Sequence, residues 1–108
     1  MATLTTQVVP LTGLAINFTN AAGGGDKCTT GDGVTLLVRN DDSTATTVTL
    51  ATPEVIDGDL TVSDRAVTVA ASAIEAIPVS SRYRDPATGL ASITYSKTTS
   101  LQVACIRR

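Results

Sequence analysis

The chain carries few side chains that perform acid–base or nucleophilic chemistry. Histidine, the commonest acid–base residue near neutral pH, is absent from its 108 residues. Glu75 lies on a predicted strand, where an outward-facing position is favoured. Most aspartates lie in predicted turns, where such residues usually cap their own backbone; they are Asp26, Asp32, Asp41, Asp42, Asp57, Asp59 and Asp85. We therefore predict no catalytic residues and no enzymatic activity.

Two cysteines, Cys28 and Cys105, stand far apart in the sequence. They have two interpretations: one disulfide that closes a long loop, or two small buried thiols that stay reduced. Residues 1–6 lack the basic and apolar regions of a secretion signal, so we expect the chain to be made in a cytoplasm and to leave it only within an assembly. We favour reduced thiols because disulfides are rare in the cytoplasm.

Three short motifs resemble ligand sites only in part. The glycine-rich stretch 23–29 fails as a phosphate loop, because Asp26 stands where a glycine should precede the lysine. The acidic turn 57–59 is too short for a calcium loop, which needs spaced oxygen ligands and a closing acid. Asn17 begins a glycosylation sequon, a chance match without a secretion signal. We predict no cofactor and no metal ion.

Composition narrows the classes of partner. The net charge is −2 and the pI about 4.8, which argues against nucleic acid because phosphate contacts need a basic face. No apolar run approaches the roughly 20 residues that cross a bilayer, so no membrane partner is expected. Hydrophobic residues make up 43% of the chain and aromatic residues only 3%, so the core must consist of small aliphatic side chains.

Arg82, Tyr83 and Arg84 form a second kind of candidate site. Arginine and tyrosine are enriched at the centres of protein interfaces, so this row suits a contact patch; an ordinary outward strand end is the equal alternative. Sugar-binding sandwiches present aromatic faces for stacking, and only Tyr83 and Tyr95 are placed to do so. Tyr95 lies on an alternating strand, which favours packing at the rim of the core.

The clearest structural pattern is the stretch 33–51, which contains two alternating apolar and polar runs joined by an Asn-Asp-Asp-Ser turn. A period of two places one apolar row against a core. We predict a β-hairpin whose core-facing residues are Val34, Leu36 and Val38 in the first strand and Val48 and Leu50 in the second. Leu37 is apolar on the outer face and marks a second covered surface.

Further strands are predicted over 13–18, 60–62, 66–69, 74–78, 90–96 and 100–107, the last covered on both sides. A helix over 66–77 is the alternative for its region, because alanine favours helices. Residues 1–30 are predicted to form an arm and a flexible glycine-rich loop, and residues 31–108 the folded domain. The fold class is all-β: an antiparallel β-sandwich or small barrel with an extended N-terminal arm.

The segments 32–40, 67–69 with 74–78, and 89–104 together resemble small β-rich capsid proteins of tailed bacteriophages. That group has a glycine-rich loop leading into a strand, an asparagine, an acidic turn and a strand. A Val-Thr-Val unit with a following Ile-x-x-Ile-Pro unit comes next, and a final hairpin contains tyrosine. The resemblance covers about residues 20–106 and consists mainly of apolar alternation.

The resemblance implies a capsid decoration, or cement, protein without catalytic residues. Such a protein binds the outer surface of the assembled shell, often as a homotrimer, and bridges neighbouring major capsid subunits. The arm would reach a neighbour by adding a strand to an exposed edge; its apolar candidates are Leu4, Val8, Val9 and Leu11. The alternatives are a head–tail connector or tail component, and a glycan-binding β-sandwich.

Overall fold

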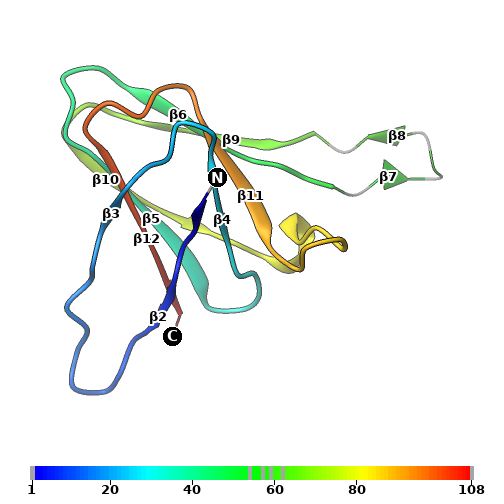
Figure 1. The fold of residues 1–108 in the computed structure, drawn as a ribbon, viewed down its shortest axis with the longest axis horizontal. Helices are drawn as coiled ribbons and strands as arrows, with labels where there is room; N and C mark the ends of the chain where they lie inside the picture. The colour runs from blue at the N-terminus through cyan, green and yellow to red at the C-terminus, as the bar shows by residue number, and fades with distance from the viewer. Residues whose placement is uncertain (1, 54, 57, 59, 62, 108) are drawn as a thin grey trace.

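Two β-sheets packed face to face form the protein, as the computed structural model shows (Figure 1). It describes residues 2–53, 55–56, 58, 60–61 and 63–107. Sheet A has the order β1 (Ala2–Thr3), β4 (Asp26–Cys28), β11 (Ala91–Tyr95), β6 (Thr46–Leu50) and β9 (Arg65–Val69). Sheet B has the order β10 (Ala73–Pro78), β5 (Val34–Asn40), β12 (Leu101–Arg107) and β2 (Thr6–Val8), and β3 (Thr19–Asn20) also pairs with β12. The all-β, two-sheet prediction is confirmed.

The sequence predicted purely antiparallel sheets, and this part of the prediction is wrong because two strand pairs are parallel. β1 pairs with β4 in parallel, and β2 pairs with β12 in parallel. Both parallel pairs involve the first eight residues, so the mixed character of the sheets comes from the N-terminal segment. The remaining pairs between the named strands of the two sheets are antiparallel.

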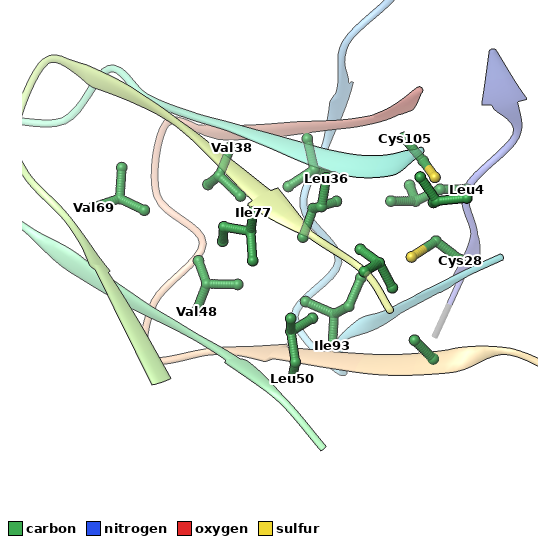
Figure 2. Packing of buried hydrophobic residues seen from close by; sticks show 14 of the residues in the cluster. Leu4, Cys28, Leu36, Val38, Val48, Leu50, Val69, Ile77, Ile93 and Cys105 are labelled. Carbon is green, nitrogen blue, oxygen red and sulfur yellow. The ribbon is translucent and has the colours of Figure 1, made fainter. Parts of the chain in front are cut away.

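The core lies between the sheets and consists of aliphatic rows that alternate with outward residues. Val34, Leu36 and Val38 on β5 are at most 3% exposed, and Val48 and Leu50 on β6 are fully buried. Figure 2 shows Leu36 and Val38 pointing across the core toward Val48 and Leu50. The inner faces were therefore predicted correctly from the period of two.

Strands β5 and β6 lie in different sheets, so the predicted hairpin over 33–51 is wrong. β5 pairs with β10 and β12, whereas β6 pairs with β11 and β9. The connection is an arch that carries the chain from one layer to the other. A hairpin and an arch bury the same alternate residues, so the sequence pattern specifies the buried face and leaves the partner strand open.

Asn40 holds this arch in place and is only 1% exposed. Its Nδ2 donates to the carbonyl oxygens of Thr44, Val69 and Ala70 at 2.9, 3.2 and 3.3 Å, and its Oδ1 accepts from the N–H of Asp42 at 3.1 Å. A sheet crossing leaves backbone groups without ladder partners in a water-poor place. The amide of Asn40 supplies those partners.

The regions 66–77 and 90–107 also contain crossings. β9 belongs to sheet A and β10 to sheet B, joined by a tight turn in which Ser72 has a φ of 58°. The strand prediction is confirmed there, and the alternative helix is wrong.

β11 and β12 likewise lie in opposite sheets, so the final hairpin expected from the resemblance is absent. Ala104 is buried and Ile106 is half-buried on the outer face of β12, which confirms its cover on both sides.

The N-terminal segment takes part in both sheets. Leu4 lies between β1 and β2 at the point where the chain crosses, and it is 7% exposed within the core. The predicted strand over 13–18 is absent, and the pairing segment is β3 instead. Gly25 is buried with a φ of +95°, and a Cβ there would collide with the backbone of Ile93. Gly25 and Asp26 are therefore packed into the domain as the chain enters β4.

Two segments extend away from the sandwich in Figure 1. One is the loop that follows β2, and the other is the long connection from β6 to β9, which carries β7 (Val55–Ile56) and β8 (Leu60–Thr61). Asp57 and Asp59, expected in a turn, lie outside the described residues. Within the described chain the one helical element is η1 (Ser81–Tyr83), and no helix there is long and apolar enough to cross a membrane.

Replacing Asn40 with alanine is expected to destabilise the fold by about 2–4 kcal/mol, because buried carbonyl and N–H groups of the arch lose their partners. Urea denaturation would measure this loss. The control is Asn17→Ala at an exposed loop position, for which we expect a change within about 0.5 kcal/mol. Equal effects of the two substitutions would show that Asn40 does not hold the arch.

The pKa of Asp42 determines how the stability of the arch responds to acid. The Lys97 ammonium, which donates to Asp42 and to the Thr44 carbonyl, and then the Ser43 N–H hold the pKa of Asp42 below its usual range. A lowered pKa adds stability above the unfolded-state value of about 4, and this is lost as the pH falls through the folded-state value. Asp42→Asn should therefore flatten the acid limb of a stability–pH curve, and Asp32→Asn, at an exposed site, should leave it unchanged.

Candidate functional site

A cleft of about 430 Å³ opens at the N-terminal end of the sandwich. β3 pairs with β12 at Gln102 and Val103, whereas β2 pairs with it from Cys105 onward. The two short strands therefore part at Ala104, which lines the cleft. The other residues around it come from the sheet crossing and from facing strands: Thr3, Leu4, Thr5, Gln7, Asn17, Thr19, Asn20, Asp26, Val103 and Cys105.

Asp26 is a buried carboxylate in the wall of this cleft and is 1% exposed. Its Oδ2 accepts from the hydroxyl of Tyr95 at 2.6 Å and from the N–H of Ala22 at 3.3 Å. Its Oδ1 is buried with no hydrogen-bond partner in the described part of the chain. Burial, and then the contact with Asp26, raise the pKa of Tyr95 far above its usual range, so the phenol remains a donor.

The prediction that Asp26 is a solvated turn residue is therefore wrong. A signal was present in the sequence: Cys28 is a residue typical of the interior, and Asp26 is two positions earlier on the same face of a strand. The predicted position of Tyr95 is confirmed, since it is half-buried and packs against the core.

Cys28 and Cys105 meet behind the cleft. Both are free and fully buried, and Figure 2 shows their sulfur atoms between the sheets beside Leu4. The Oγ1 of Thr6 lies 3.7 Å from the sulfur of Cys105 and 2.5 Å from the Oγ1 of Thr29. Of the two interpretations of the cysteines, the structure shows the buried free thiols and not the disulfide.

The two thiols have opposite acidities. The neighbouring thiol of Cys28, with weaker help from Thr6 and Thr29, lowers the pKa of Cys105 to about 6 against the opposing effect of burial. The same contact and burial raise the pKa of Cys28 far above its usual range. Cys105 is therefore the thiol that loses its proton first, and it is the more nucleophilic member of the pair near neutral pH.

This arrangement lacks the parts of a nucleophilic hydrolase. A cysteine nucleophile normally works with a base that takes up and returns a proton, and the chain has no histidine for that role. The described residues contain no group of three or more His, Cys, Asp or Glu side chains suited to hold a metal ion. What the cleft offers is thiol chemistry and hydrogen bonding.

A second candidate surface is the loop after β2, where several large apolar side chains face solvent. Val8, Val9, Leu11 and Ile16 are 53%, 39%, 109% and 38% exposed. Exposed apolar residues scattered singly are ordinary, whereas a group on one projecting segment is typical of an interaction site. We call residues 8–16 the apolar loop.

The base of the apolar loop is fixed by Gln7. Its Nε2 donates to the carbonyl of Asn17 at 2.9 Å, and its Oε1 accepts from the N–H of the same residue at 3.0 Å. Gly13, with a φ of +96°, donates its N–H to the carbonyl of Pro10 and turns the chain near the tip. The loop is therefore a defined projection whose two ends are held together.

The predicted contact residues fall into three environments. Val8, Val9 and Leu11 lie on the apolar loop, but Leu4 is in the core, so its expected availability to a partner is corrected. Arg82 and Arg84 are exposed and line a separate cleft of about 470 Å³ with Pro53, Ser81 and Pro86. Tyr83 lies between them on η1 but is half-buried against the core. Figure 1 places η1 well away from the apolar loop, so the structure does not unite the two groups.

Comparison with known proteins identifies no similar protein. No protein-family model matches this chain, nor does a curated protein or a solved structure. The resemblance to phage capsid proteins therefore stays a prediction that rests on the residues alone.

Tyr95→Phe is expected to destabilise the protein by about 1–3 kcal/mol, because the Asp26 carboxylate loses its shortest donor in a buried place. The control is Tyr83→Phe, which removes a hydroxyl from the other half-buried tyrosine packed against the core. Combining Tyr95→Phe with Asp26→Asn in a double-mutant cycle measures the coupling between the two groups. Additive effects of the two substitutions would show that this hydrogen bond contributes nothing to stability.

Proposed function

We propose that this chain is a structural virion protein that binds the outer surface of a phage capsid and bridges neighbouring major capsid subunits. The observation that carries the proposal is the apolar loop. It exposes Val8, Val9, Leu11 and Ile16, its base is fixed by Gln7, and it projects from the sandwich. A fixed projection loses little conformational freedom when it is buried against a partner, so more of its apolar burial contributes to affinity.

Two further features suit a binding role without chemistry. The described residues form a small aliphatic sandwich, and the buried polar side chain of Asn40 serves the fold. The edge of sheet B at β2 continues directly into the apolar loop, and a strand edge beside apolar anchors is a common way to take up a neighbouring chain. The partner would supply an apolar groove for the loop.

The glycan-binding alternative has weaker support. Carbohydrate rings stack on open aromatic faces, but Tyr95 is half-buried and bonded to Asp26, and Tyr83 packs against the core. A head–tail connector or tail component would use the same loop, and it differs from a decoration protein in copy number. As a decoration protein, the chain would be made in the host cytoplasm, would stand on the capsid exterior, and would assemble as a homo-oligomer such as a trimer.

Binding to purified shells tests the proposal. Leu11→Ser should weaken binding by roughly 10- to 30-fold, because burial of a leucine side chain contributes about 2 kcal/mol. The matched control is Ile74→Ser, which removes an apolar side chain, 61% exposed, from β10 at the other edge of sheet B. The shells are those of the virus that encodes the chain, and binding is measured by sedimentation of the chain with the shells.

Counting the chain in purified particles separates the alternatives. A number comparable to that of the major capsid protein supports decoration. A single ring of copies per particle would indicate a connector, and absence of the chain from particles would overturn the proposal. Equal weakening by Leu11→Ser and Ile74→Ser would show that the apolar loop is not the contact.

A further inference from the structure

We propose that Cys28 and Cys105 form a redox-active dithiol, which a low-molecular-weight disulfide oxidises to an intrachain disulfide joining β4 of sheet A to β12 of sheet B. The proposal concerns the interior of the N-terminal end and does not depend on the capsid role. It assigns to the two buried cysteines a modification that makes the end of the sandwich covalent.

The first observation is that the two thiols lie at the same end of the core, one from each sheet. Cys28 and Cys105 come from opposite sheets, and both side chains point into the shared core (Figure 2). The Oγ1 of Thr6 lies 3.7 Å from the sulfur of Cys105 and 2.5 Å from the Oγ1 of Thr29, the residue that follows Cys28. One hydroxyl group of β2 therefore links the sulfur of Cys105 to the chain segment that carries Cys28.

The second observation is a route for the proton and for the oxidant. Thr29 is exposed, its hydroxyl contacts the hydroxyl of Thr6, and that hydroxyl contacts the sulfur of Cys105. These two hydroxyl groups connect the buried thiol to the surface. Cys105, although fully buried, stands in the wall of the N-terminal cleft and Cys28 does not, so a small sulfur compound in the cleft reaches Cys105 first when the short edge pairing of β2 opens.

The chemistry needs one oxidant and balances without a metal. The thiolate of Cys105 attacks one sulfur of the small disulfide, whose bond breaks to release one thiolate and leave a mixed disulfide on Cys105. Cys28 then gives up its proton, attacks the sulfur of Cys105 and releases the second small thiolate. The two cysteines are oxidised, the small disulfide is reduced to two thiols, and the two cysteine protons end on those thiols.

The crosslink would join the two strands that hold the N-terminal segment. β4 pairs with β1, and β12 pairs with β2. A bond between Cys28 and Cys105 also closes a loop that spans most of the chain, which restricts the unfolded state and favours the folded one. Oxidation is therefore expected to stabilise the protein and to keep residues 2–8 in place.

The test measures the equilibrium between the full-length chain and mixtures of reduced and oxidised glutathione, in buffer and again in concentrated denaturant. Intact mass reports loss of two hydrogens, and digestion identifies a Cys28–Cys105 linked peptide. We expect the disulfide to form about 100-fold more favourably in the folded chain than in the denatured chain, as linkage to folding requires. Dithiothreitol should reverse it, and the oxidised form should melt several degrees higher.

Because these measurements use the natural sequence, they do not depend on any variant folding. Cys28→Ser provides the control: Cys105 should then hold glutathione as a persistent adduct, since no second thiol releases it. A linked peptide with an equilibrium no better than that of the denatured chain would overturn the proposal. Unreacted thiols, a lasting glutathione adduct on the natural chain or disulfides between chains would also overturn it.

Discussion

The buried amide of Asn40 satisfies the main physical constraint on this fold. A chain that passes between two packed sheets must cross roughly 10 Å and leaves backbone groups without ladder partners. Asn40 stands at the end of β5 and bonds to the carbonyls of Thr44, Val69 and Ala70, so one side chain holds both the crossing from β5 to β6 and the nearby crossing from β9 to β10. With these crossings fixed, the aliphatic rows of β5 and β6 face each other rather than lying side by side.

The faces of the strands could be predicted from sequence, whereas their partners could not. The alternation at Val34, Leu36 and Val38 is local, and it indicates the inner side of a strand wherever that strand pairs. Pairing depends on residues distant in the chain: β5 has β12 on one side and β10 on the other. Short connections usually join paired neighbours, which is why 33–51 suggested a hairpin. The buried Asn40 marks the arch, but in the sequence it is indistinguishable from a turn residue.

The candidate site was harder to predict from sequence than the strands, because its residues meet through contacts that are distant in the chain. Asp26 follows three glycines and precedes a lysine, a setting typical of a solvated loop, yet β11 covers it and brings Tyr95 to its carboxylate. The meeting of Cys28 with Cys105 follows only from the packing of β4 against β12. Leu4 was grouped with the contact residues because it lies in the predicted N-terminal arm, but the crossing from β1 to β2 turns it into the core. Val8, Val9 and Leu11 were predicted as contact residues of the arm, where Pro10 interrupts a regular strand, whereas Ile16 was placed on a strand that does not form.

The interior and the exterior of the N-terminal end are linked through the same two strands. β4 and β12 carry the thiols on their inner faces, and at their edges they pair with β1 and β2. The apolar loop begins where β2 ends, so the position of any partner bound there depends on how firmly β2 is held to β12. That pairing is short and at a sheet edge, where local opening costs the least free energy. A bond between β4 and β12 would hold in register the two strands on which β1 and β2 are built, and so would stiffen the base of the loop without altering its surface.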